Sequence, residues 1–190
     1  MRLSSRCATF GAIFAFFLAT LDGHEEPSSC SVRSLPADIQ SHLKLDFGSW
    51  KVQESGNLSK YARKIWESRK LPGCPGIAVG LFQSANYPAY ALLLVPVNHP
   101  DAGYRILVFS RSMRGPSYQT TLVEKSDEAG ASNYFLSKVP IAEFFSDESN
   151  KKFQMQTTEA ILKVDAGDHE YEADICYWSN GSYRQEPVDY

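Results

Sequence analysis

Three apolar segments between Cys74 and Arg111 form the most regular hydrophobic pattern of the chain, and two polar breaks separate them. Residues 89–97 (AYALLLVPV) are almost continuously apolar, which predicts a strand buried on both faces near the centre of a sheet. Residues 76–82 (GIAVGLF) and 104–110 (YRILVFS) predict strands on either side of it. Because the breaks are short and a parallel crossover needs a dozen or more residues, the pattern predicts an antiparallel meander.

Two segments that precede the meander have helical periodicity. Residues 58–70 (LSKYARKIWESRK) carry apolar side chains three and four positions apart, which predicts an amphipathic helix with a basic, solvated opposite face. The predicted buried face consists of Leu58, Tyr61, Ala62, Ile65 and Trp66. Residues 35–43 predict a shorter helix, with Ser34 as its N-cap and Pro36 in its first turn. Residues 47–52 predict a strand between the two helices.

The rest of the chain alternates strand-like segments with polar turns. Strands are predicted over residues 118–124, 134–139, 160–164, 171–178 and 182–188, whereas residues 141–152 fit either a helix or a loop. Asn180-Gly181 separates the last two segments and indicates a tight β-hairpin. These elements predict an α+β fold that is mainly antiparallel β-sheet, a meander plus a C-terminal hairpin, with one or two N-terminal helices.

The first residues have the layout of a signal peptide. A short basic start, residues 1–6, precedes the apolar run 7–21, and this run is too short for the roughly 20 residues of a spanning helix. A membrane anchor is the alternative interpretation. The expected organisation is a signal peptide over 1–23, a flexible segment over 24–34 and a single α+β domain over 35–190. The protein is therefore expected to be periplasmic or secreted, with no stable membrane span after cleavage.

The net charge of the chain bears on whether its partner is a nucleic acid. The formal net charge is −3, and removal of the predicted signal peptide makes the mature chain slightly more acidic. A nucleic-acid-binding surface needs clustered Lys and Arg side chains, so no nucleic-acid partner is expected.

Three cysteines remain after the predicted cleavage, Cys30, Cys74 and Cys176, so at most one intrachain disulfide is expected. The preferred pair is Cys74–Cys176, because both residues flank predicted core strands and the predicted compartment is oxidising. Cys30–Cys176 and Cys30–Cys74 are the alternatives. A nucleophilic Cys74 would need a neighbouring base, and the adjacent sequence supplies none.

No catalytic motif is present in the sequence. The four histidines lack zinc-site spacing, and there is no GxSxG element, P-loop or GxGxxG element. No catalytic, cofactor-binding or metal-ligating residue is therefore assigned, and no cofactor is expected. Dispersed carboxylates would still allow a glycosidase.

Aromatic side chains near arginines suggest a recognition surface instead. Aromatic residues and Arg are enriched at the centres of protein interfaces. The preferred candidate is the C-terminal hairpin, with interaction residues Tyr177, Trp178, Tyr183 and Arg184.

A family resemblance agrees with this interpretation. GIAVGLFQSANYPAYALLLVPV followed by YRILVFS resembles an FG-GAP or VCBS-type β repeat, and the ending YWSNGSYR resembles the closing hairpin of small uncharacterised exported bacterial proteins. Residues 83–88 lack the acidic ligands that bind calcium in such repeats, so no calcium site is carried over. The resemblance implies an extracytoplasmic β module that binds rather than catalyses.

The functional expectation is an exported protein-binding domain that recognises a protein partner. Its most specific form is a periplasmic inhibitor or immunity protein against a cell-wall hydrolase or toxin, because a small exported domain without catalytic motifs suits that task. The alternatives are an envelope polysaccharide or peptide hydrolase, and a structural or ligand-carrier protein of the envelope.

Overall fold

The computed structural model describes residues 30–71, 73–111, 117–145, 157–167 and 171–189. The predicted signal peptide lies outside these residues, and so does most of the predicted segment 24–34. None of the helices within the described ranges has the length and apolar character needed to cross a membrane.

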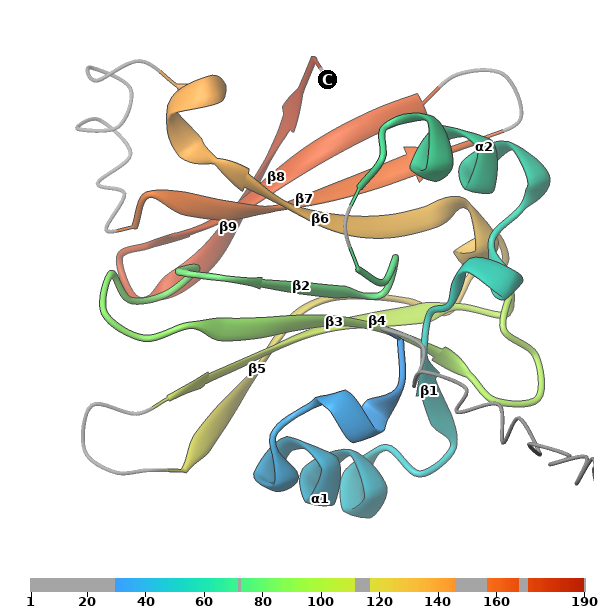
Figure 1. Cartoon of the computed structure of the whole chain (residues 1–190), viewed down its shortest axis with the longest axis horizontal. Coiled ribbons are helices and arrows are strands. Elements are labelled where there is room, and N and C mark those ends of the chain that lie inside the picture. The colour runs from blue at the N-terminus through green and yellow to red at the C-terminus, as the bar shows by residue number, and fades with distance from the viewer. Residues whose placement is uncertain (1–29, 72, 112–116, 146–156, 168–170, 190) are drawn as a thin grey trace, which may run out of the picture.

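The elements form two antiparallel sheets and two α-helices, which confirms the predicted α+β class (Figure 1). The α-helices are α1 (Ala37–Asp46) and α2 (Lys60–Ser68), and the single 3-10 turns are η1 (Val32–Ser34), η2 (Ser55–Asn57), η3 (Ala131–Asn133) and η4 (Ile141–Glu143). The strands are β1 (Trp50–Val52), β2 (Ile77–Gly80), β3 (Ala89–Pro96), β4 (Tyr104–Arg111), β5 (Tyr118–Ser126), β6 (Tyr134–Pro140), β7 (Glu159–Ala166), β8 (Tyr171–Ser179) and β9 (Ser182–Val188).

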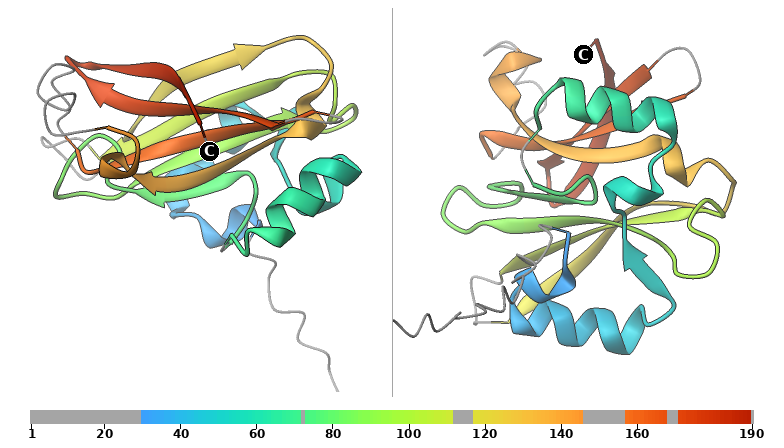
Figure 2. Two further views of the ribbon diagram at one scale, coloured as in Figure 1. Left: turned by 90° about the horizontal axis from the view of Figure 1, so that it is seen from above. Right: turned by 45° about the vertical axis from the view of Figure 1, so that its right-hand side comes forward.

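The two sheets lie face to face, with one helix outside each. Sheet A has the order β1-β3-β4-β5, with β2 also paired to β3, and sheet B has the order β6-β7-β8-β9. Figures 1 and 2 show α1 against the outer face of sheet A and α2 against sheet B. The predicted meander of β2, β3 and β4 is confirmed, and all its pairings are antiparallel.

Strand β3 is buried on both faces, as its apolar run predicts. Ala91, Leu93 and Val95 pack between the two sheets, whereas Leu92 and Leu94 face α1. Full burial of each Leu side chain stabilises the fold by roughly 1.5–3 kcal/mol. The central strand therefore joins the inter-sheet core to the core beneath α1.

Helix α2 buries the predicted apolar face against sheet B. Ala62, Ile65 and Trp66 are buried, and the Trp66 ring meets Phe135 of β6 edge to face at a centroid distance of 5.4 Å. The helix begins after Ser59, whose Oγ accepts a hydrogen bond from the N–H of Ala62 at 3.2 Å. This side-chain cap satisfies one of the free N–H groups at the helix start.

The start of α1 differs from the prediction. Pro36 is the N-cap residue and the helix runs from Ala37, so Ser34 does not cap it. Ser34 instead lies in η1 and donates its hydroxyl hydrogen bond to the Ser31 carbonyl. Residues 30–34 were expected to be flexible, yet this stretch contains a 3-10 turn and the buried side chain of Cys30.

The disulfide joins Cys30 to Cys74, so the preferred Cys74–Cys176 pairing is wrong. The Cα atoms of the bonded pair lie 4.8 Å apart. Cys176 is a free, buried cysteine on β8, and its side chain lies in the core between the sheets, whereas Cys74 lies in the core beneath α1. Sheet A therefore separates the two cysteines that the sequence pattern favours as a pair.

The predicted Asn-Gly hairpin is confirmed between β8 and β9. Ser179 pairs with Ser182, and both Asn180 and Gly181 have positive φ angles, 50° and 79°. This left-handed pair matches the right-handed twist of the flanking strands.

Glu159 links the sheets at the β2 side of the molecule. Its carboxylate accepts hydrogen bonds from the Leu81 N–H at 2.7 Å and from Lys138 Nζ at 2.9 Å. Burial opposes the charged form, but these two hydrogen bonds outweigh burial and lower the pKa of Glu159.

Removal of the disulfide tests the observed connectivity. We expect Cys30→Ala to lower the free energy of unfolding by about 2–4 kcal/mol, because the unfolded chain loses a long cross-linked loop. Urea denaturation with and without reductant measures this loss, and the Cys30→Ala variant should no longer respond to reductant. A response that persists in Cys30→Ala and vanishes in Cys176→Ala would contradict the Cys30–Cys74 bridge.

Glu159→Gln tests the acid-labile link between the sheets. Because the folded-state pKa of Glu159 is lowered, its carboxylate stabilises the fold above the unfolded pKa, and this stability is lost as the pH falls through the folded pKa. We expect the variant to lose about 1–2 kcal/mol at pH 7 and to approach the wild type in acid. Urea denaturation across the pH range measures the difference, and the exposed Glu143→Gln serves as the control.

Candidate binding site

A partly buried ion network, with the buried Lys163 at its centre, crosses the space between the sheets. The ammonium of Lys163 on β7 donates to both carboxylate oxygens of Glu124 on β5 at 3.0 Å, and to Asp174 Oδ2 on β8 at 3.0 Å. The Tyr104 hydroxyl donates to Glu124, and Gln185 Nε2 donates to Asp174 Oδ2 at 2.8 Å. Every charge of the network therefore has a partner, as buried charges require.

An irregularity in β5 places Glu124 in this network. Glu124 lies opposite Ile106 and Leu122 lies opposite Leu107, so Val123 is an extra residue on the β5 side. This is the arrangement of a β-bulge, which redirects side chains within a strand. Ile106 faces sheet B, and its cross-strand neighbour Glu124 therefore faces sheet B as well.

The network sets the protonation of its members. Burial alone would lower the pKa of Lys163, but the hydrogen bonds and negative charges of Glu124 and Asp174 outweigh burial and raise it. Burial and the hydrogen bond to Glu124 raise the pKa of Tyr104. Lys163 is thus a cation and Tyr104 a neutral hydrogen-bond donor at neutral pH.

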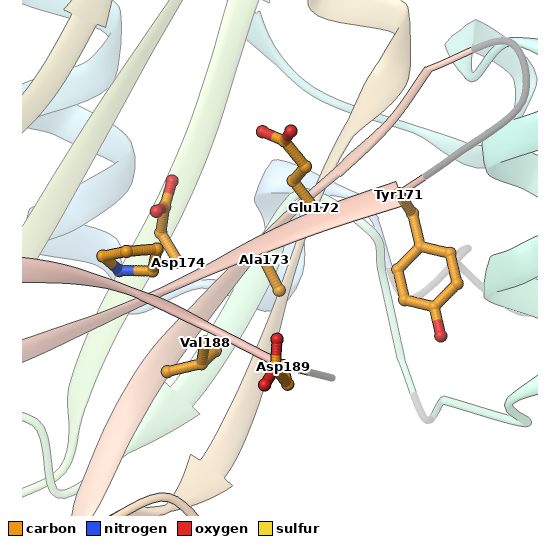
Figure 3. A pocket seen from close by; sticks show the side chains of 7 residues that line it. Tyr171, Glu172, Ala173, Asp174, Val188 and Asp189 are labelled. Carbon is orange, nitrogen blue, oxygen red and sulfur yellow. The ribbon is translucent and has the colours of Figure 1, made fainter.

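Beyond this network, the β8–β9 ladder borders an open recess of about 690 Å³ (Figure 3). We call it the acidic recess; it is lined by Tyr171, Glu172, Ala173, Asp174, Pro187, Val188 and Asp189. In Figure 3, Glu172 and Asp174 point to one side of β8, while Tyr171 and Ala173 point to the other. This alternation follows from the strand geometry, because successive side chains point to opposite faces of a sheet.

The charge of the acidic recess is negative. Asp174 shares its charge with Lys163, but Glu172 and Asp189 form no ion pair with any described residue. The Tyr171 ring forms one wall and is fixed by Arg69, which donates to its hydroxyl at 2.9 Å and stacks over the ring at 5.1 Å. An open recess with two such carboxylates suits a cationic group.

The predicted interaction residues of the hairpin are not all on the surface. Tyr177 is only 2% exposed and packs under Phe145, so its assignment to an exposed surface is wrong. Trp178 and Tyr183 pair across the hairpin with ring centroids 5.0 Å apart, and both are partly buried. Arg184 is exposed on β9. Arg184 lies opposite Tyr177 and Trp178 lies opposite Tyr183, so Arg184 and Trp178 are on opposite faces of the hairpin, and Tyr177 supports the core.

The cysteines have structural roles. Cys74 is bonded to Cys30, so it is not a nucleophile in the oxidised protein. Burial raises the pKa of the Cys176 thiol to about 12, which keeps it protonated and unreactive.

Sequence reasoning missed Lys163, Glu124 and Asp174. The one signal for Lys163 was its position inside the apolar run AILKV, where a lysine requires a carboxylate partner if the strand is buried. Its partners lie 39 positions before it and 11 after it, and only the strand register brings them together.

Comparison of the sequence and the structure with protein-family models, curated proteins and solved structures finds no match. The resemblance to an FG-GAP or VCBS-type repeat therefore stays a prediction.

Lys163→Met tests the network. The variant leaves the partly exposed carboxylates of Glu124 and Asp174 facing each other without a cation, and the loss of hydrogen bonds to charged groups costs about 1.5–3 kcal/mol. The free energy of unfolding in urea measures the loss. Lys125→Met removes an exposed lysine next to Glu124 and should change stability by less than about 0.5 kcal/mol. Equal effects in both variants would contradict the role given to Lys163.

Proposed function

We propose that this chain is an exported protein-binding domain, and that it acts as an inhibitor or immunity protein against a secreted hydrolase or toxin. The observation that carries the proposal is the acidic recess, because it is open and keeps two carboxylates without an ion-pair partner among the described residues. The predicted signal peptide supports the exported location.

The acidic recess suits a lysine or arginine side chain of the partner. The carboxylates of Glu172 and Asp189 offer charge-assisted hydrogen bonds, and a guanidinium forms such bonds in pairs. Val188 and Pro187 provide apolar contact for the methylene groups of that side chain.

The geometry gives less support to a hydrolase. Glu124 and Asp174 are two carboxylates that the fold brings together from different sheets, and the Lys163 ammonium lies between them at 3.0 Å from each. A glycosidase needs the space between its two carboxylates for the scissile bond and for water. In this protein Lys163 occupies that space.

A carrier of an apolar ligand also receives less support. The region between the sheets is filled by buried side chains from both sheets, including Leu93, Ile106, Leu136 and Ile161. A ligand carrier of this architecture needs an internal cavity instead of a packed core.

Trp178 and Arg184 lie toward the turn of the hairpin on opposite faces of the β8–β9 ladder, so an interface that extends from the acidic recess along one face includes one of them. Trp178 lies on β8 and Arg184 on β9, so the strands that border the acidic recess also carry both residues. Trp and Arg are the residue types that most often dominate binding energy.

Neutral variants of the acidic recess test the proposal. The exported chain is first used to retain partners from envelope or secreted extract, and the retained protein is identified by mass spectrometry and purified. We expect Glu172→Gln and Asp189→Asn each to weaken its binding at least about tenfold, because each removes one charge-assisted contact. Calorimetry measures the affinity, and Asp38→Asn on the exposed start of α1 is the control.

The same complex tests the hairpin, through Trp178→Ala and Arg184→Ala. Unchanged affinity in these two variants would remove the hairpin tip from the interface. Unchanged affinity in Glu172→Gln and Asp189→Asn would contradict the role of the acidic recess. If the chain neither inhibits nor neutralises the partner that it retains, the hypothesis of an inhibitor or immunity protein is wrong.

A further inference from the structure

A second surface, on the outer face of sheet A, has the opposite chemistry. A groove of about 290 Å³ lies there, and we call it the Val79 groove; its lining residues are Ser34, Leu35, Gly73, Cys74, Ile77, Val79 and Tyr90. Leu35 and Cys74 are buried, whereas Val79 on β2 is 42% exposed. The side chain of Val79 thus points away from the core and is partly exposed to solvent, beside a groove with an apolar floor.

Helix α1 covers only part of this face. Figure 1 shows α1 below sheet A, while the ends of β3, β4 and β5 on the left of the view extend past it. Val79 lies opposite Tyr90, and Tyr90 lies opposite Phe109, so one cross-strand row runs from the Val79 groove toward the helix. Phe109 is fully buried, and exposure increases along the row toward Val79.

Two tyrosines and an arginine continue the surface beyond the Val79 groove. The rings of Tyr90 and Tyr118 meet edge to face at 5.9 Å, and the Arg111 guanidinium lies over the Tyr118 ring at 5.5 Å. Arg111 is exposed and forms no ion pair within the described part of the chain. Its charge is therefore available to an anionic group of a partner.

The charge around the Val79 groove identifies the kind of occupant. None of the lining residues is acidic. Arg111 lies over the ring of Tyr118, which contacts the lining residue Tyr90, so it provides positive charge near an apolar floor, on a chain whose net charge is negative. A positively charged surface of this kind favours partners with negatively charged groups.

We propose that the Val79 groove binds an extended segment of a partner protein in which an apolar side chain is flanked by carboxylates. The apolar side chain contacts Ile77, Val79 and Tyr90, and a flanking carboxylate pairs with Arg111. This surface lies on sheet A, so the proposal does not depend on the acidic recess of sheet B.

The disulfide maintains the Val79 groove. Ser34 and Leu35 form one wall, and the strands β2 and β3 form the other. The Cys30–Cys74 bond joins the segment before Ser34 to the segment before β2, and it thereby fixes the separation of the walls. Reduction should therefore weaken binding in the Val79 groove without a change at the acidic recess.

An NMR titration with a model peptide tests this inference. The probe is a blocked peptide of sequence Gly-Glu-Phe-Glu-Gly, added to the isotope-labelled exported chain. We expect saturable shift changes at Val79, Tyr90 and Arg111 with a Kd of about 1 mM, as suits a short flexible ligand. The analogue Gly-Gln-Phe-Gln-Gly should bind at least about threefold more weakly, because it lacks the carboxylates.

Surface variants decide where the peptide binds. Val79→Lys and Arg111→Gln change exposed side chains, so both should fold, and each should reduce the affinity at least about threefold. Leu45→Lys on α1 changes another exposed apolar residue and should leave the affinity unchanged. Shift changes confined to other surfaces, equal binding of both peptides, or no saturable binding would overturn the proposal. Results for Glu172→Gln remain separate, because that residue lies on sheet B.

Discussion

The burial of both faces of β3 is the constraint on which the rest of the structure depends. Its inward residues, such as Leu93, need the cover of sheet B, and its outward residues, such as Leu92, need the cover of α1. A single sheet with one helix would leave one of these faces in water. The chain therefore builds a second sheet, and the Cys30–Cys74 bond fastens the segment that leads into α1 against the start of β2. The predicted oxidising compartment makes this link available.

The inner face of sheet B, which covers the inward side chains of β3, is apolar only in part. Leu136, Ile161 and Cys176 complete the core between the sheets, but their strands also carry Lys163 and Asp174 on the same face. These charges would be costly if they were buried alone. The bulge in β5 brings Glu124 across from sheet A, so the cost is offset by ionic hydrogen bonds from three strands. Outside this network, Glu172 and Asp189 lie at the adjoining ends of β8 and β9 and line the acidic recess.

Local signals predicted the elements, and long-range pairing decided what they form. The continuous apolar run of β3, the spacing of Ala62, Ile65 and Trp66, and the Asn180-Gly181 turn each reflect a local cause, and each prediction is confirmed. The disulfide is different, because no local sequence pattern shows which cysteines lie close in space. Sheet A separates the side chains of Cys74 and Cys176. The partners of Lys163 and the lining of the acidic recess likewise depend on register. Tyr177 differs from Trp178 in exposure because adjacent strand residues point to opposite faces, and the sequence does not show which face is covered.

The dimensions of α1 explain why the Val79 groove stays open. A helix of 10 residues is about 15 Å long, whereas a strand of 8 residues extends about 26 Å. One such helix therefore leaves part of the outer face of sheet A uncovered, whatever its direction. The chain places Arg111 and two tyrosines on that part, and these residues tolerate water and also favour interfaces. Val79 differs from these residues, because its side chain has no polar group that could hydrogen-bond with water. Its position beside an apolar groove, together with the carboxylates of the acidic recess on sheet B, is the surface chemistry on which the proposed binding function rests.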